Sequence, residues 1–141
     1  IENEVGRLLE KNYPVQPIRI VVNSFPEKGR FFSLQLGLEI AGSSFCFIQN
    51  IDNPFITKEL LAEMIQMKKP GAYVVPVYKN QRGHPVLIGP AVMKHCRSLK
   101  GYEYNIRQEL MNFEEIKVDC TGENILANIN TTEIYQKYFL S

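Results

Sequence analysis

Asp52 is the residue with the clearest potential for chemistry, because it follows the apolar run FCFIQNI, residues 45–51. Asn53 and Pro54 come directly after it and prevent that run from continuing as a strand. The carboxylate has two interpretations. It accepts a nearby backbone N–H in an Asx-type turn, which the local sequence favours. Alternatively, it is an oxygen ligand for Mg²⁺, which prefers one or two carboxylates together with phosphates and waters.

A second group of polar residues lies in QRGHPVLI, residues 81–88. Arg82 can hold a phosphate, Gly83 permits close approach of the backbone to a ligand, and His84 can donate a hydrogen bond. The alternative is an ordinary hairpin-like turn that carries a solvated arginine and histidine. The local sequence favours that turn.

A third group precedes the last expected helix, in NINTTE at residues 128–133. Asn130 or Thr131 can cap that helix, with Glu133 at the far end of a capping box. Alternatively, amide oxygens of Asn128 and Asn130 complete a metal or phosphate site. Capping is the simpler interpretation.

The remaining histidine, the cysteines and the common catalytic motifs do not indicate a further active site. His95 and Cys96 are adjacent on an expected helix, where neighbouring side chains point in different directions, so they do not form a nucleophile–base pair. The chain has three cysteines and no CxxC pair, which disfavours a zinc site and a disulfide framework. HExxH, GxSxG, GxxxxGK[ST] and GxGxxG are all absent from the sequence.

The bulk composition is that of a soluble globular domain, with 45% hydrophobic and 22% charged residues among 141. Lysine and arginine number 16 against 15 acidic residues, and they are scattered, so we expect no nucleic-acid partner. No apolar stretch approaches the ~20 residues that span a bilayer, so we expect no membrane segment. Unpaired cysteines and the lack of a signal peptide favour the cytoplasm.

Hydrophobic periodicity predicts alternating helices and strands. Expected helices cover 2–12, 34–40 (capped by Ser33), 58–69, 91–99, 103–112 and 131–139, and expected strands cover 18–23, 44–51, 71–78, 86–88 and 114–119. Pro76 predicts an edge, a bulge or an irregular strand. The near-continuous apolarity of 44–51 predicts a strand buried on both faces.

This alternation predicts one α/β domain over residues 1–141, with a mostly parallel Rossmann-like sheet and helices on both faces. Ligands of such sheets bind beyond the carboxyl ends of the strands, which is where Asp52 falls.

Five short motifs occur in an order that resembles a known family. They are VVN (21–23), Gly29 followed by SLQLGL (33–38), IDNPF (51–55), RGHPVLI (82–88) and NINTTEIY (128–135). The set is similar to the nucleotidyltransferases of molybdenum-cofactor synthesis, the molybdopterin guanylyl- and cytidylyltransferases. The resemblance covers roughly residues 18–139.

The resemblance implies a three-layer nucleotidyltransferase-like fold and Mg²⁺-dependent transfer of a nucleotidyl group. The donor would be CTP or GTP, the acceptor molybdopterin or a similar phosphorylated molecule, and the by-product pyrophosphate. By the same resemblance Asp52 is the catalytic metal ligand, helped by Asn130. The implied substrate-binding residues are Ser33, Arg82, Gly83, His84, Asn128 and Thr131.

The chain also departs from that family. The Gly-rich L-x-A-G-x-S-x-R-M-G loop is missing from these residues, Thr132 stands in place of a proline, and Ile134 replaces an acidic residue. Only Gly101 and Arg107 remain of a G-D-x-G-x-R pattern. These departures keep open a second interpretation, a non-catalytic relative that retains the fold as a nucleotide-binding or interaction module. A weaker third is transfer to a sugar phosphate.

The missing loop also implies a missing first strand, and the chain begins with Ile rather than Met. We therefore expect an N-terminally incomplete fold that exposes apolar surface. Either a longer natural protein, which we favour, or a homodimer would cover that surface.

Overall fold

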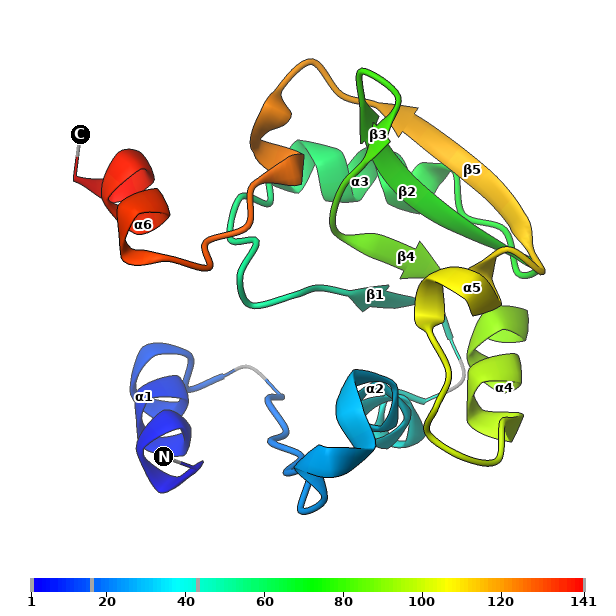
Figure 1. The fold of residues 1–141 in the computed structure, drawn as a ribbon, viewed down its shortest axis with the longest axis horizontal. Coiled ribbons are helices and arrows are strands. Elements are labelled where there is room, and N and C mark those ends of the chain that lie inside the picture. Colours follow the sequence, from blue (N-terminus) through cyan, green and yellow to red (C-terminus); the bar gives the residue numbers. More distant parts are fainter. Residues whose placement is uncertain (1, 16, 43, 141) are drawn as a thin grey trace.

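The computed structural model describes residues 2–15, 17–42 and 44–140 (Figure 1). Its helices are α1 (Glu2–Asn12), α2 (Gly29–Ile40), α3 (Lys58–Gln66), α4 (Pro90–Ser98), α5 (Ile106–Leu110) and α6 (Thr132–Phe139). Its strands are β1 (Cys46–Ile48), β2 (Ala72–Tyr78), β3 (Gln81–Arg82), β4 (Val86–Ile88) and β5 (Glu114–Asp119). Two short 3₁₀ turns are η1 (Pro26–Lys28) and η2 (Glu123–Leu126).

The sheet is built around β2. Strand β5 runs parallel to one edge of β2, while β3 and β4 follow each other antiparallel along the other edge. Strand β1 then pairs antiparallel with β4, so β1, β2 and β5 all point the same way. The α/β class is confirmed. The pairing differs from expectation, because the reversed β4 lies between β1 and β2 and most ladders are therefore antiparallel.

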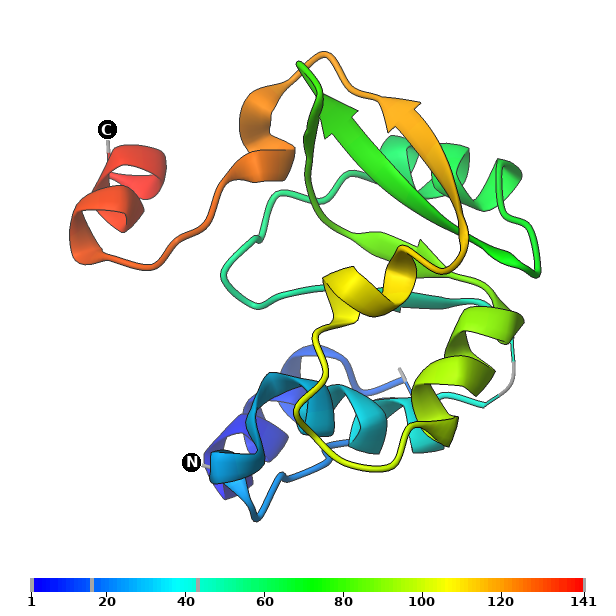
Figure 2. The same cartoon turned by 45° about the vertical axis from the view of Figure 1, so that its right-hand side comes forward.

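Helices cover both faces of the sheet, as Figure 2 shows. One face of β2 packs with α2, α4 and α5 in a core that includes Phe31, Leu38, Tyr73, Val75, Val77, Ile88, Val92, Met93, Cys96 and Leu110. The other face packs with α3 and η2 through Leu60, Met64, Val74, Leu87, Val118 and Ile125. Alternation of side chains along β2 assigns its residues to these two cores. The expected three layers are confirmed.

Local sequence signals explain where two of the helices begin. The Thr57 hydroxyl accepts a hydrogen bond from the Leu60 N–H at 3.2 Å and caps α3. Pro90 opens α4, where its missing N–H costs nothing. The preceding Gly89 is required, because a Cβ there would lie 2.5 Å from the Pro70 carbonyl oxygen.

Residues 18–23 do not form the expected strand. They belong to no ladder, and Ile18, Ile20, Val21 and Val22 are between 38% and 49% exposed. A strand needs a second backbone beside it to satisfy its N–H and C=O groups. Within the described part of the chain no strand runs beside this segment, and β1 pairs with β4 alone.

Several boundaries also differ from the predictions. Helix α2 begins at Gly29, directly after η1, so Ser33 lies inside the helix and does not cap it. Helix α5 is shorter than expected, because Asn105 caps it by accepting the Arg107 N–H at 2.9 Å. Strand β1 covers only three residues, which are half-buried rather than buried on both faces, since β1 lies at an edge of the sheet.

Pro76 lies in the central strand, so the edge interpretation is wrong. On the edge of β2 that pairs with β3 and β4, the ladder is interrupted between these two strands. At the interruption the Pro76 carbonyl accepts the Gly83 N–H at 2.8 Å. Of the three interpretations of Pro76, the irregular strand is the one the structure supports. This interruption directs residues 83–85 away from the regular ladder and toward the site described next.

Candidate functional site

Three loops meet beyond the carboxyl end of β1: residues 49–53, 83–85 and 125–131. The Ile129 N–H donates to the Asp52 carbonyl at 2.6 Å, and the His84 N–H donates to the Ile125 carbonyl at 3.1 Å. Three of the segments predicted from separate motifs are therefore joined by backbone hydrogen bonds.

Asn53 holds the loops together. Its side chain is 1% exposed, and its Nδ2 donates to the carbonyls of Ile125 at 3.1 Å and Ala127 at 2.6 Å. A buried amide that bonds two carbonyls of another loop fixes the distance between the two segments. We infer a structural role for Asn53 beyond its predicted role in ending the strand.

Gly83 allows the second loop to approach the third. A Cβ at this position would lie 2.5 Å from the Ile125 carbonyl oxygen and 2.8 Å from the Ile125 Cβ. Such contacts are too close for any larger residue. The expected close approach at Gly83 is thus made to this chain's own backbone, and it brings His84 beside the Asp52 loop.

The Asp52 carboxylate does not make the Asx-type turn. A turn is present at residues 50–53, but the backbone makes it, since the Asn53 N–H donates to the Asn50 carbonyl at 3.2 Å. The Asp52 Oδ1 atom is buried and has no hydrogen-bond partner in the described chain. A buried polar atom without a partner is rare and calls for a water, an ion or a ligand.

The donor set fits Mg²⁺ better than a transition metal. Among the described residues no three His, Cys, Asp or Glu side chains gather in one place. Mg²⁺ does not require such a cage, because it keeps waters and takes one or two carboxylates together with substrate phosphates. The unpartnered oxygen of Asp52 satisfies that limited requirement, with the exposed Asn128 and Asn130 flanking the residue that bonds the Asp52 carbonyl.

His84 is half-buried, and burial lowers the pKa of its imidazole from 6.5. The Asp52 carboxylate opposes that effect, whereas the positive charges of Arg30 and Arg107 add to it. The ring is therefore neutral at pH 7. Its Nε2 lies 3.1 Å from the Asn50 Nδ2, and its Nδ1 is buried without a partner in the described chain.

Arg30, Asn50 and Arg107 were not predicted as site residues. Arg30 reaches from the start of α2 and donates to the Asn50 Oδ1 at 3.1 Å. Neither arginine has a carboxylate within salt-bridge distance in the described part of the chain. Two such cations close to His84 favour an anionic ligand. One sequence signal was present, because Asn50 precedes Asp52 by two residues after the same strand.

Arg82 is directed elsewhere. Its Nε lies 2.5 Å from the Glu115 Oε2, which also accepts the Tyr73 hydroxyl at 2.7 Å. The Arg82 guanidinium lowers the pKa of Glu115, while burial and the bond to Glu115 raise the pKa of Tyr73 to about 12. Arg82 thus joins β3 to β5, and the structure gives no support to its predicted role in substrate binding.

Ser33 and Thr131 already have hydrogen-bond partners. The Ser33 hydroxyl lies 3.0 Å from the Asn23 Nδ2, which donates to it, and 3.4 Å from the Gly29 carbonyl. Thr131 caps α6 by accepting the Ile134 N–H at 3.3 Å, which confirms the capping interpretation.

His95 and Cys96 do not form a nucleophile–base pair. Burial, followed by the charge of Glu109, raises the pKa of the Cys96 thiol to about 11, so the thiolate is not accessible at neutral pH. The His95 Nε2 lies 2.7 Å from the Glu109 Oε2 instead. Both residues hold α4 against its neighbours.

Residues 4–115 match the family model described as MobA-like NTP transferase domain. The chain belongs to this family. The family suspected from the order of the motifs is therefore confirmed, and the match takes in Arg30, Asp52 and His84. A search among curated proteins found no match.

Membership gives the MobA-like chain a nucleotidyltransferase-like function with a nucleoside triphosphate as substrate. The match ends before the loop of residues 125–131, so the position of that loop beside Asp52 comes from the structure alone. In the described part of this MobA-like chain, no helix has the length and hydrophobicity needed to cross a membrane.

Proposed function

We propose that this MobA-like domain transfers a nucleotidyl group from CTP or GTP to molybdopterin or a similar phosphorylated acceptor and releases pyrophosphate. One observation carries the proposal. The three loops beyond β1 leave the Asp52 Oδ1 and the His84 Nδ1 buried without partners, near the positive charges of Arg30 and Arg107. Polar groups arranged in this way can receive phosphate and metal.

The reaction makes modest demands on the protein. An oxygen of the acceptor phosphate attacks the α-phosphorus of the nucleotide, and the bond from that phosphorus to the bridging oxygen breaks as pyrophosphate leaves. Positioning and neutralisation of charge supply most of the catalysis in such transfers. Bound Mg²⁺ would neutralise phosphate charge. We assign it to Asp52, with an amide oxygen of Asn130 as a further ligand.

The remaining residues of the site receive unequal roles. His84 faces the acceptor, with Gly83 permitting its approach. Asn128 has one weak hydrogen bond, to the Leu126 carbonyl at 3.4 Å, and is exposed, so it is free to contact a phosphate. Ser33 and Thr131 contribute less, because their hydroxyls are engaged within the chain.

Replacement of Asp52 by asparagine tests the proposal, because it removes the charge and keeps the shape. We expect pyrophosphate release from Mg-CTP or Mg-GTP, with molybdopterin as the acceptor, to fall at least about a hundredfold. Asp119→Asn is the matched control, since Asp119 lies exposed at the end of β5. Unchanged turnover in Asp52→Asn would contradict the assignment of the metal ligand.

A non-catalytic, nucleotide-binding relative is the second candidate. It is favoured by the single carboxylate at the site, since no other acidic side chain of the described chain forms a hydrogen bond or an ion pair with residues 49–53. Calorimetry with Mg-CTP and Mg-GTP, combined with the pyrophosphate assay, separates the candidates. Micromolar binding with turnover rules the second one out, and binding without turnover supports it. Sedimentation of the same sample tests the homodimer, which is the alternative to a longer natural protein.

A further inference from the structure

Arg30, Asn50 and His84 form a continuous hydrogen-bonded chain that leads to the unpartnered Nδ1 of the histidine. We propose that Arg30 and Asn50 are positioning residues that present His84 to a phosphate group of the acceptor as a hydrogen-bond donor from Nδ1. The inference rests on the proposed function for the identity of the ligand. The geometry of the chain does not depend on it.

The direction of each hydrogen bond follows from what each group can do. A guanidinium only donates, so the Asn50 atom that faces Arg30 at 3.1 Å must be the amide oxygen. The amide nitrogen of Asn50 then faces His84. An amide nitrogen only donates, so the His84 Nε2, 3.1 Å away, must accept. Arg30 thereby fixes the orientation of Asn50, and Asn50 fixes the histidine tautomer.

A histidine that accepts at Nε2 and is neutral carries its proton on Nδ1. Burial and the charges of Arg30 and Arg107 both keep the ring neutral, because each lowers its pKa. The Nδ1–H is therefore a buried donor with no acceptor of the described chain within hydrogen-bond distance. An N–H in that state requires an acceptor from outside the chain.

A phosphate oxygen is the acceptor that this environment favours. Arg30 and Arg107 contribute two positive charges near the ring, while Asp52 contributes one negative charge. The local balance is attractive to an anion. Within the described chain, no carboxylate forms an ion pair with Arg30, Arg107 or His84.

Nuclear magnetic resonance of the ¹⁵N-histidine-labelled full chain tests the tautomer directly. Correlations between ring nitrogens and carbon-bound ring protons separate the two neutral tautomers from the cation. The chain has two histidines, so a His84→Gln sample assigns the signals. We expect the Nδ1–H tautomer in the wild type. In Asn50→Asp the new side chain can only accept, so we expect His84 to carry a proton on Nε2.

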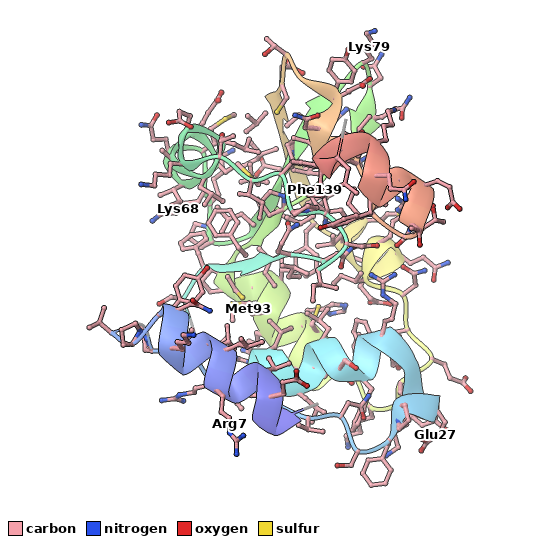
Figure 3. All side chains as sticks on the ribbon, turned by 90° about the vertical axis from the view of Figure 1, so that its left-hand side faces the viewer. Arg7, Glu27, Lys68, Lys79, Met93 and Phe139 are labelled. Carbon is pink, nitrogen blue, oxygen red and sulfur yellow. The ribbon has the colours of Figure 1, made fainter. Side chains whose placement is uncertain are left out.

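Titration with inorganic phosphate tests the ligand. We expect phosphate to shift the His84 Nδ1 signal of the wild type, and Arg30→Met to weaken that binding about tenfold or more. Arg7→Met is the matched control for the loss of one positive charge. Arg7 is exposed on α1, and Figure 3 shows its side chain directed away from the rest of the molecule.

Three results would overturn the proposal: an Nε2–H tautomer in the wild type, a Nδ1 signal that phosphate does not move, or equal phosphate affinity in Arg30→Met and the wild type. If Arg30→Met does not fold, Asn50→Asp still decides the matter, since it keeps the acceptor for Arg30. None of these measurements requires nucleotidyl transfer. Failure of the Asp52→Asn test would refute the proposed reaction and leave the tautomer result standing.

Discussion

Of two runs of β-branched residues in this chain, one forms a buried strand and the other forms no strand. AYVVPVY at 72–78 forms the central strand β2, where Val74 and Val75 are 1% and 2% exposed. IRIVV at 18–22 belongs to no strand, and its Val21 and Val22 are 38% and 49% exposed. Both runs are rich in β-branched residues. They differ in their neighbours, because β2 has a strand along each edge and a helical layer on each face.

The difference shows that β-propensity records how well a residue fits a packed, pleated surface, and does not by itself make a strand. The exposed surface of the whole chain is consistent with this. It amounts to 10047 Å², whereas a compact protein of 16.2 kDa exposes roughly 7,500 Å². Exposed large apolar residues concentrate before α2, at Val5, Leu8, Tyr13, Val15, Ile18, Ile20, Val21, Val22 and Phe25.

The same substitution in the two runs gives the largest expected contrast. Val74→Ala removes two buried methyl groups beside Leu87 and Val118, so we expect the free energy of unfolding to fall by about 2–3 kcal/mol. Val22→Ala acts on a half-exposed side chain, so we expect a change within about 0.5 kcal/mol. Urea denaturation of both variants against the wild type measures the difference.

Equal losses at the two positions would show that residues 18–22 are buried in solution by contacts absent from this structure. A small loss at both would show that the β2 core tolerates the cavity. Only a large difference between the two variants agrees with the packing described.

Two glycines give a second matched pair. Gly83→Ala places a methyl group against the Ile125 carbonyl at 2.5 Å, so the loops must separate, and we expect a loss of about 1–3 kcal/mol. Gly37 lies in α2 with no atom within 4 Å of an added Cβ. There we expect Gly37→Ala to gain about 0.5–1 kcal/mol from helix propensity. Thermal unfolding of both variants compares the effects.

The sign of the change is the decisive result for this pair. A stabilising Gly83→Ala would mean that the second loop does not approach Ile125 in solution. A destabilising Gly37→Ala would mean that α2 is covered on that side.

Signals that depend on a few neighbouring residues predicted the fold well. The cap at Thr131 and the strand at 114–119 occur where the sequence placed them, and helices α3 and α4 begin where Thr57 and Pro90 supply local start signals. Partner-dependent features were predicted less well. The strand at 18–23 failed for lack of a neighbour, and the reversed β4 changed the pairing of the sheet.

In the candidate site, too, residues whose contacts depend on distant partners were predicted less well. The resemblance to the family placed Asp52 and His84 near a ligand, although the local sequence favoured a plain turn at each position. The sequence could not place Arg30, because its bond to Asn50 joins residues twenty positions apart and depends on where α2 lies relative to the loop after β1. Arg82, by contrast, was predicted to bind substrate but bonds Glu115. Its side chain was available to a nearby carboxylate, and the pairing of β2 with β5 supplied Glu115.

The pH dependence of stability gives the smallest expected effect and tests whether His84 belongs to the packed region. Its pKa in the folded state lies below 6.5, because burial and two arginines disfavour the cation, with Asp52 opposing them. The unfolded chain therefore binds the proton first as the pH falls through 6.5. Stability should decrease as the pH falls from 6.5 toward the lower pKa of the folded state, and should not depend on this residue above 6.5.

Unfolding free energies of the wild type and His84→Gln, measured at intervals from about pH 5 to pH 8, isolate this contribution. We expect the difference between the two proteins to be constant above pH 6.5 and to shift in favour of the variant below it. The Glu115 carboxylate does not interfere, since its pKa lies below 4.5. A shift in favour of the wild type on acidification would mean that the Asp52 carboxylate dominates the environment of His84, so that the histidine binds its proton more tightly in the folded chain than in the unfolded one.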